Sequence, residues 1–219
     1  MLLVPIVYDG FAQRKLQPGD LLCGKDPALP ATDTTNTTFS YTAANILQNP
    51  VYVRNPAGVS TDTYPTADAL ISALMQGLGM ANGVPAGLSF KFRIINLSAN
   101  LLTGAVTANT GATMVRGNVL ASTTKDFLIQ ITNGTPAQSF TNLTTVSGSA
   151  VVSGFTAAQI ALLSVGMIVT NAVANLQGQT IIGINATALT VTMSGNANAS
   201  AATNTISFSP TYTITGLAA

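Results

Sequence analysis

The side chains that could carry acid–base or metal chemistry are few in this chain and lie in its first part. The 219 residues include seven Asp, eight Lys and Arg together, one Cys, and no His or Glu. Asp126 is the last charged residue, so residues 127–219 offer only hydroxyl, amide and apolar side chains. Acid–base catalysis, metal binding by carboxylate or imidazole, and phosphate binding by cations all need groups that this stretch lacks. A structural or adhesive role is therefore favoured.

The motifs of common catalytic and metal sites are absent from the sequence. There is no glycine-rich phosphate loop, no Cys or His cluster and no Gly-x-Ser-x-Gly elbow. Cys23 has no histidine to activate it and no second cysteine with which to form a disulfide. Asp26, Asp33 and Asn36 offer oxygen ligands, but their spacing does not match a calcium-binding loop. We therefore expect no enzyme activity, no cofactor and no metal.

The charge balance limits the partners. Charged residues make up 7% of the chain, against about 25% in an ordinary soluble domain, and the net charge is +1. The cations are scattered rather than clustered, which argues against nucleic acid. The uncharged stretch Ala150–Ala174 is interrupted by polar residues and has no flanking cation, so we expect no membrane span.

Residues 1–33 have the composition of an extended N-terminal arm. Proline and glycine interrupt this segment repeatedly, and it contains four of the seven Asp residues. Its apolar residues need another surface for burial, so it either docks on a partner subunit or forms an edge strand of its own domain. The candidate partner-contact residues are Val4, Ile6, Val7, Arg14, Lys15, Leu21 and Leu22.

Residues 34–137 have the pattern of a β-sandwich domain with one short helix. Residues 90–94 alternate, with Phe90, Phe92 and Ile94 on one face, which predicts a half-buried strand of an antiparallel sheet. Further strands are expected at 39–42, 51–54, 101–107, 113–116 and 127–132. The apolar spacing over 66–77 predicts a helix capped by Thr66 and packed on a sheet.

Residues 138–219 predict a small, uncharged all-β domain. Short Thr- and Val-rich strands are expected at 140–146, 150–152, 167–170, 180–184, 189–193 and 205–214, with a helical turn at 156–163. None of these strands carries the Lys or Glu that usually discourages edge-to-edge association. Their edges must therefore close within the domain or pair with other subunits.

Three parts of the chain resemble virion proteins of tailed bacteriophages. Lys15–Asp20, just after Tyr8-Asp9-Gly10, resembles a lead-in segment of phage fibre and head-decoration proteins. Phe92–Asn96 and Lys125–Thr135 are similar to head-decoration proteins. The C-terminal segments 163–169, 178–182, 189–194 and 206–208 resemble a small β module of phage head and tail proteins, although that module usually has a Gly-x-Gly turn where this chain has Asn171-Ala172-Val173.

The resemblance implies a capsid decoration (cement) protein with a jelly-roll-like antiparallel β-sandwich. Such a protein is a homotrimer that binds the major capsid protein on the outer head surface of the virion, after synthesis in the host cytoplasm. One alternative is a tail fibre or baseplate adhesin that binds host-surface glycans, for which exposed aromatic residues would be expected. Another is a polysaccharide hydrolase, which would need two positioned carboxylates such as Asp62 and Asp68. Contacts through the uncharged half should respond little to salt or pH.

Overall fold

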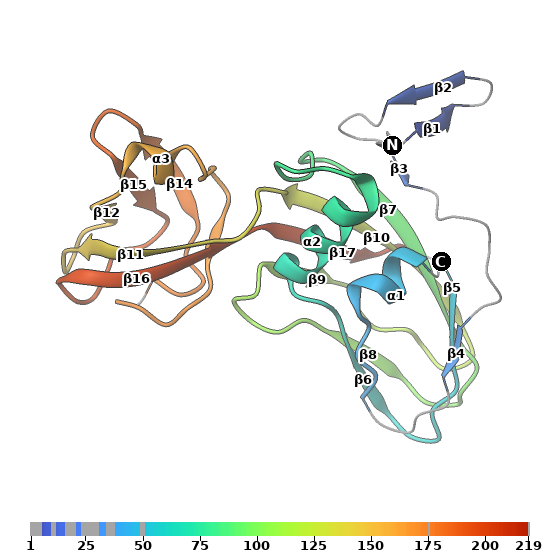
Figure 1. Cartoon of the computed structure of the whole chain (residues 1–219). Helices are drawn as coiled ribbons and strands as arrows, with labels where there is room; N and C mark the ends of the chain where they lie inside the picture. The colour runs from blue at the N-terminus through green and yellow to red at the C-terminus, as the bar shows by residue number, and fades with distance from the viewer. Residues whose placement is uncertain are drawn as a thin grey trace.

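The computed structural model describes residues 6–9, 12–15, 21–22, 31–33, 38–48, 51–174 and 176–218, with side chains from residue 38 onward. The described chain is mainly β, with three helices and several sheets. Two lobes, each with its own hydrophobic core, are joined by two extended strands (Figure 1). We call the described residues of 21–133 and 211–218 the body and residues 138–209 the insert.

The body is built on a seven-stranded mixed sheet. Its strand order is β4 (Ala31–Asp33), β5 (Val51–Arg54), β7 (Ser89–Asn96), β10 (Thr124–Asn133), β17 (Thr211–Gly216) and β9 (Ala112–Val115), with β3 (Leu21–Leu22) also paired to β7. The predicted strand at 90–94 is confirmed. The prediction of an antiparallel sheet is wrong for this part, because β5 and β7 run parallel. The connection between them contains β6 and α2, and a crossover of this length permits parallel pairing.

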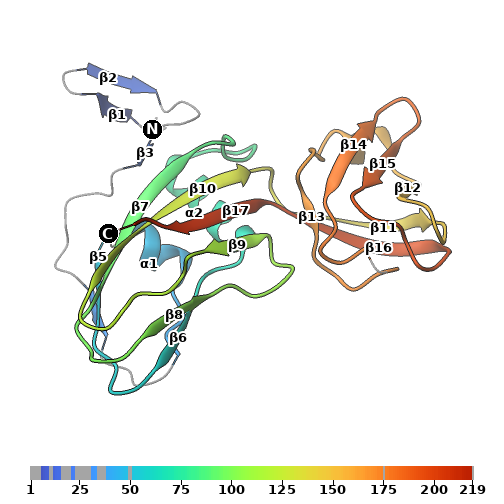
Figure 2. The same ribbon diagram turned by 180° about the vertical axis from the view of Figure 1, so that it is seen from behind.

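Two helices, α1 (Ala43–Gln48) and α2 (Ala67–Leu78), lie on one face of this sheet (Figures 1 and 2). The Thr66 side chain caps α2 by accepting from the Ala69 N–H, and Gly79 ends it in the left-handed conformation. Leu70, Ile71 and Leu74 are buried, each contributing about 1.5–3 kcal/mol. The predicted helix and its packing are thus confirmed, whereas α1 was not predicted.

A smaller parallel pair, β6 (Ser60–Thr63) and β8 (Leu102–Ala105), completes the body. The predicted strand at 39–42 is reduced to one bridge between Ser40 and Thr63, because the chain turns into α1. Near the N-terminus, β1 (Ile6–Asp9) and β2 (Ala12–Lys15) form an antiparallel hairpin.

The insert is a closed six-stranded barrel. Its order is β13 (Ile168–Val169), β16 (Ala201–Ser209), β11 (Gln138–Thr145), β12 (Val151–Ser153), β15 (Thr190–Met193) and β14 (Ile181–Asn185). Backbone bonds from Gly166 N to Ile181 O and from Ile181 N to Met167 O, both 2.8 Å, join the last strand to the first. The uncharged strands therefore close within the lobe, and helix α3 (Ala157–Ile160) begins at a Thr156–Gln159 capping box.

The final strand corrects the predicted boundary of 138–219. The predicted strand at 205–214 is two strands, β16 and β17, separated at Pro210, which has no backbone N–H for a ladder. β17 inserts between β10 and β9, and its buried Tyr212 and Ile214 belong to the core of the body. The barrel is thus inserted between two neighbouring strands of the body sheet rather than appended after it.

Candidate functional site

Six of the seven predicted arm residues lie in described strands, and Val4 lies outside the described residues. In the hairpin, Ile6 faces Lys15 and Val7 faces Arg14. Leu21 and Leu22 form β3, which pairs with the start of β7. β3 and β4 therefore add strands to the chain's own sheet, which is one of the two arrangements considered for the arm.

The most buried charged pair of the described chain is a structural element of the body. Both nitrogens Nε and Nη2 of Arg54 donate to the Asp62 carboxylate at 2.9 Å. Ser60 Oγ and the Tyr41 hydroxyl also donate to it, at 2.9 and 3.2 Å, and the guanidinium lies 4.8 Å from the centre of the Phe39 ring. Since Asp62 is 2% exposed and fully bonded, it is unsuited to proton transfer with a substrate.

A second ion pair lies on the open face of the sheet. Arg93 of β7 and Asp126 of β10 are register partners, and Arg93 donates to both carboxylate oxygens at 2.6 and 3.0 Å. This hydrogen bond holds the pKa of Asp126 below its ordinary value and raises the pKa of Arg93. Because both side chains are substantially exposed, the pair stabilises the fold only slightly.

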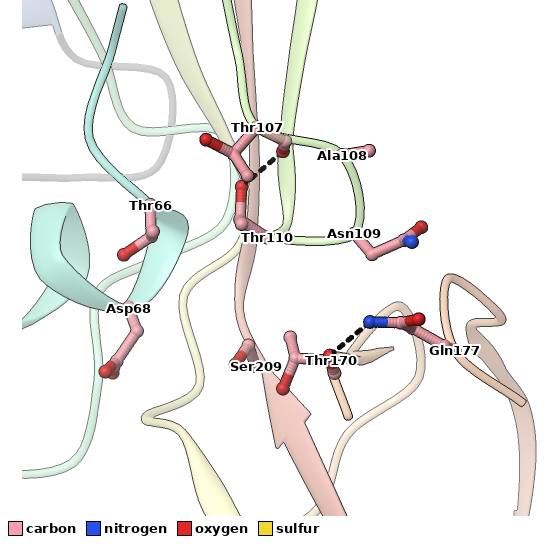
Figure 3. Close-up of a pocket in the computed structure, with 9 residues that line it drawn as sticks. All are labelled: Thr66, Asp68, Thr107, Ala108, Asn109, Thr110, Thr170, Gln177 and Ser209. Atoms are coloured by element: carbon pink, nitrogen blue, oxygen red, sulfur yellow. Dashed lines mark hydrogen bonds between the residues drawn. The ribbon is translucent and has the colours of Figure 1, made fainter. Parts of the chain in front are cut away.

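A cleft of about 370 Å³ separates the body from the insert (Figure 3). Asp68, at the start of α2, provides its one charged group, and the other side chains are hydroxyls, amides and one methyl. Gln177 of the insert is held by a 2.9 Å bond from Nε2 to Thr170 O. This chemistry suits a neutral, hydroxyl-rich ligand. The lining residues are Thr66, Asp68, Thr107, Ala108, Asn109, Thr110, Thr170, Gln177 and Ser209.

The joint between body and insert is held by Asn133, which is 5% exposed. Its Nδ2 donates to Ser164 Oγ at 2.8 Å and to Val165 O at 2.9 Å, while its Oδ1 accepts from the Thr135 N–H at 2.9 Å. Thr211 Oγ1 adds a 3.3 Å bond to Gly166 O. The turn at 164–166 of the insert is thereby fastened to the strand ends of the body.

Three loops gather at the end of the body where β7 ends and β10 begins. We call residues 55–59, 97–101 and 117–123 the loop end. Asn96, 1% exposed, joins two of them, because its Nδ2 donates to Asn100 O at 2.8 Å and Leu120 O at 3.0 Å. Its Oδ1 accepts from the Ser98 N–H and hydroxyl at 3.1 and 2.9 Å. The third loop joins through Ser60 N and Leu101 O.

The loop end exposes Val59, Leu97 and Leu120 by 69, 58 and 64%. These side chains lie on loops that hydrogen bonds join at one end of the body, and apolar residues exposed together on a folded protein are typical of contact surfaces. The sequence pattern did not indicate this surface, because the three residues are far apart in the chain. One local signal was present, since Leu97 is an aliphatic residue within a run of Asn and Ser that could have been marked as an exposed loop.

The remaining candidates do not come together. Asp62 is buried in its ion pair while Asp68 is exposed at the cleft, so the proposed hydrolase pair is not assembled. Within the described residues, no cluster of three or more potential ligands could hold a metal ion. Of the three residues weighed for calcium, Asp33 lies in β4, and Asp26 and Asn36 lie outside the described residues.

Aromatic residues after position 126 all lie in the two cores. The five residues are 0 to 8% exposed, so they provide no aromatic surface for sugar stacking: Phe127, Phe140, Phe155, Phe208 and Tyr212. Among the helices that the structure describes, none has the length and apolarity needed to cross a bilayer.

Comparison of the chain with protein-family models, with curated proteins and with solved structures finds no match.

Proposed function

We propose that this chain is a non-enzymatic structural protein of a tailed-bacteriophage virion, a capsid decoration or cement protein. It would bind the major capsid protein on the outer surface of the head, as a homotrimer, and stabilise the shell. In this proposal the body has the architecture of a jelly-roll-like β-sandwich. The sequence resemblance described above supplies the phage context, and nucleic acid has no part in the function.

The observation that carries the proposal is the contrast between the two lobes. The insert is a closed barrel without a single charged side chain in its described part, yet it exposes Val146, Val151, Leu162, Val165 and Ile182 by 41 to 57%. Charge repulsion cannot keep such a surface apart from its neighbours. A protein that works by association needs no such repulsion, and many modest contacts over a repetitive shell add up to strong attachment.

The decisive experiment counts copies and measures stability. Purified particles should carry hundreds of copies of the chain on the head, by quantitative mass spectrometry and by immunogold labelling. Heads that lack the chain should release their genome at a lower temperature, and adding the purified protein should restore the higher temperature. A handful of copies confined to the tail, or heads of unchanged stability, would contradict the proposal.

The cleft between body and insert favours a second candidate, an adhesin of the tail fibre or baseplate that binds host-surface glycans. A carboxylate beside several amides and hydroxyls can bind the vicinal hydroxyls of a sugar. NMR titration with glucose, galactose and N-acetylglucosamine tests this, and Asp68→Asn should weaken any binding. Asp126→Asn is the control, because Asp126 does not line the cleft. Absence of shifts at Asp68 and Gln177 would exclude the adhesin function for these sugars.

A further inference from the structure

The loop end carries the three most exposed large aliphatic side chains of the described chain. Val59, Leu120 and Leu97 exceed every exposed aliphatic residue of the insert, where the highest value is 57%. Their exposure leaves apolar surface in water, which is unfavourable by about 25 cal/mol per Å². The three residues lie on loops that follow β5 and β7 and precede β10, at the end of the body opposite the one from which the insert departs (Figures 1 and 2), so a contact there is distinct from the barrel.

The loop end is held in place before any partner arrives. Besides the Asn96 bonds, Ser122 N donates to Ser98 O at 2.9 Å, and Leu97 N donates to Arg54 O at 2.8 Å. Arg54 is itself fixed by its buried pair with Asp62. A contact surface whose loops are already ordered loses less conformational entropy on binding.

Two cationic groups lie beside one of these side chains, Leu120. Leu120 lines a pocket of about 230 Å³ together with Arg116, Lys125 and Leu217, and no residue that lines this pocket carries a carboxylate. The Lys125 ammonium donates to Arg116 O and Asn118 O, both at 2.8 Å. These bonds fix the ammonium beside the start of the loop at 117–123. The loop end therefore presents exposed aliphatic side chains with two cationic groups beside one of them.

We propose that the loop end is the surface by which this protein binds the phage coat, and that it fits an apolar recess bordered by carboxylates. This inference rests on the proposed function and identifies the partner-facing part of the molecule. Carboxylates on the coat would pair with the Arg116 guanidinium and the Lys125 ammonium, while the recess covers the three aliphatic side chains.

A second copy of the chain fits the loop end less well than a coat protein with carboxylates does. A two-fold contact places the same surface against itself, so Arg116 and Lys125 of one copy would face the same cations of the other. Without carboxylates among the residues that line the pocket, this arrangement brings like charges together and is unfavourable. The charges of the loop end thus favour a partner that is a different protein with acidic groups at the contact.

The test uses the full chain and heads that lack it, with binding measured by co-sedimentation. In the variant V59S/L97S/L120S we expect about 100-fold weaker binding, because exposed anchors of this kind dominate interface affinity. The control V115S removes an exposed aliphatic residue of β9, outside the loop end and the barrel, and should bind like the wild type. Thermal unfolding should be nearly unchanged in both variants, since all four side chains are exposed.

The salt dependence of head binding tests whether the coat protein contributes carboxylates to the contact. Binding of the wild type should weaken as salt rises, and R116Q should reduce this dependence while lowering affinity most at low salt. If the wild type fails to bind heads, the proposed function and this inference both fail. If the wild type binds and the triple variant binds equally well, only this inference is overturned. Loss of self-association in the triple variant, measured by light scattering, with unchanged head binding would also overturn it.

Discussion

At the scale of single residues, the few charges of this protein serve two different purposes. Arg54 and Asp62 are completely buried and fully bonded, so they hold the centre of the body together. Arg93 and Asp126 have the same chemistry but lie on an exposed sheet face. Burial decides the difference, because water screens the exposed pair and competes for its hydrogen bonds.

Asp62→Asn should therefore destabilise the protein by about 3–5 kcal/mol, because it leaves the buried guanidinium without its counter-ion. Asp126→Asn is the matched control and should change the free energy of unfolding by less than about 1 kcal/mol. Urea unfolding at neutral pH measures both. Equal effects of the two substitutions would contradict a structural role for the buried pair.

Buried tyrosines give the protein a distinctive response to alkali. Burial raises the pKa of Tyr41, Tyr64 and Tyr212 above the ordinary value of 10.0. Below that value both states keep these protons, and above it the unfolded chain alone releases them. Stability should therefore fall as pH rises above about 10, by up to about 1.4 kcal/mol per pH unit for each tyrosine. Urea unfolding between pH 8 and 11 measures this slope.

Tyr64→Phe provides the control for this slope. The Tyr64 hydroxyl is buried and has no hydrogen-bond partner among the described residues, so its removal should leave stability at pH 7 unchanged or higher. The alkaline slope should decrease, because one of the buried tyrosines with a raised pKa is lost. Strong destabilisation at pH 7 would show that the hydroxyl has a structural role.

At the scale of elements, the joint between body and insert depends on the point where β10 becomes β11 and β16 becomes β17. Asn133 lies there at a register shift in the β10–β17 ladder and bonds to the turn at 164–166. A Cβ on the following Gly134 would overlap the carbonyl oxygen of Val84, so the chain passes the body in close contact. Local bonding of this kind fixes the angle between two lobes that have separate cores.

Asn133→Ala should loosen this angle more than it disturbs either lobe. It removes both hydrogen bonds from Asn133 Nδ2 to the insert, those to Ser164 Oγ and Val165 O, at about 1–3 kcal/mol. Small-angle scattering and spin-label distances between the lobes should broaden, while the circular dichroism spectrum stays the same. Gln130→Ala, an exposed change on the same strand, should leave the distances unchanged.

At the scale of the whole molecule, one β domain is inserted into another through two adjacent strands. Asn133 and Thr211 are register partners at the exit from the body, and Gln138 and Phe208 are partners at the entrance to the insert. The two connecting strands therefore leave the body side by side and enter the insert side by side. Domain insertion is tolerated in this geometry.

Replacing residues 134–210 by Asn-Gly should leave a folded body, because this dipeptide forms the two-residue turn that a hairpin between β10 and β17 needs. The isolated segment 137–209 should fold as the barrel. Cooperative thermal unfolding and dispersed NMR spectra of both fragments are the measurements. An unfolded body fragment would show that the insert is part of the folding unit.

The sequence by itself determined the local structure and the absence of charge chemistry in the second half. Alternation at Phe90–Ile94, the capped helix after Thr66 and the helical turn within 156–163 are local patterns, since period and hydrogen bonding act over a few residues. These elements lie where the sequence indicates. The composition of residues 127–219 likewise sets the available side-chain chemistry before any folding.

Only the tertiary structure decided how these elements meet. The return of β17 to the body, the closure of the barrel, the pairing of Arg54 with Asp62 and the gathering of Val59, Leu97 and Leu120 all join distant parts of the chain. Strand pairing and loop packing depend on the complete set of competing partners, and a local pattern does not contain that information. The sequence therefore gives the chemical character of each residue in the candidate contact surface. It does not show that these residues come together at one end of the folded protein.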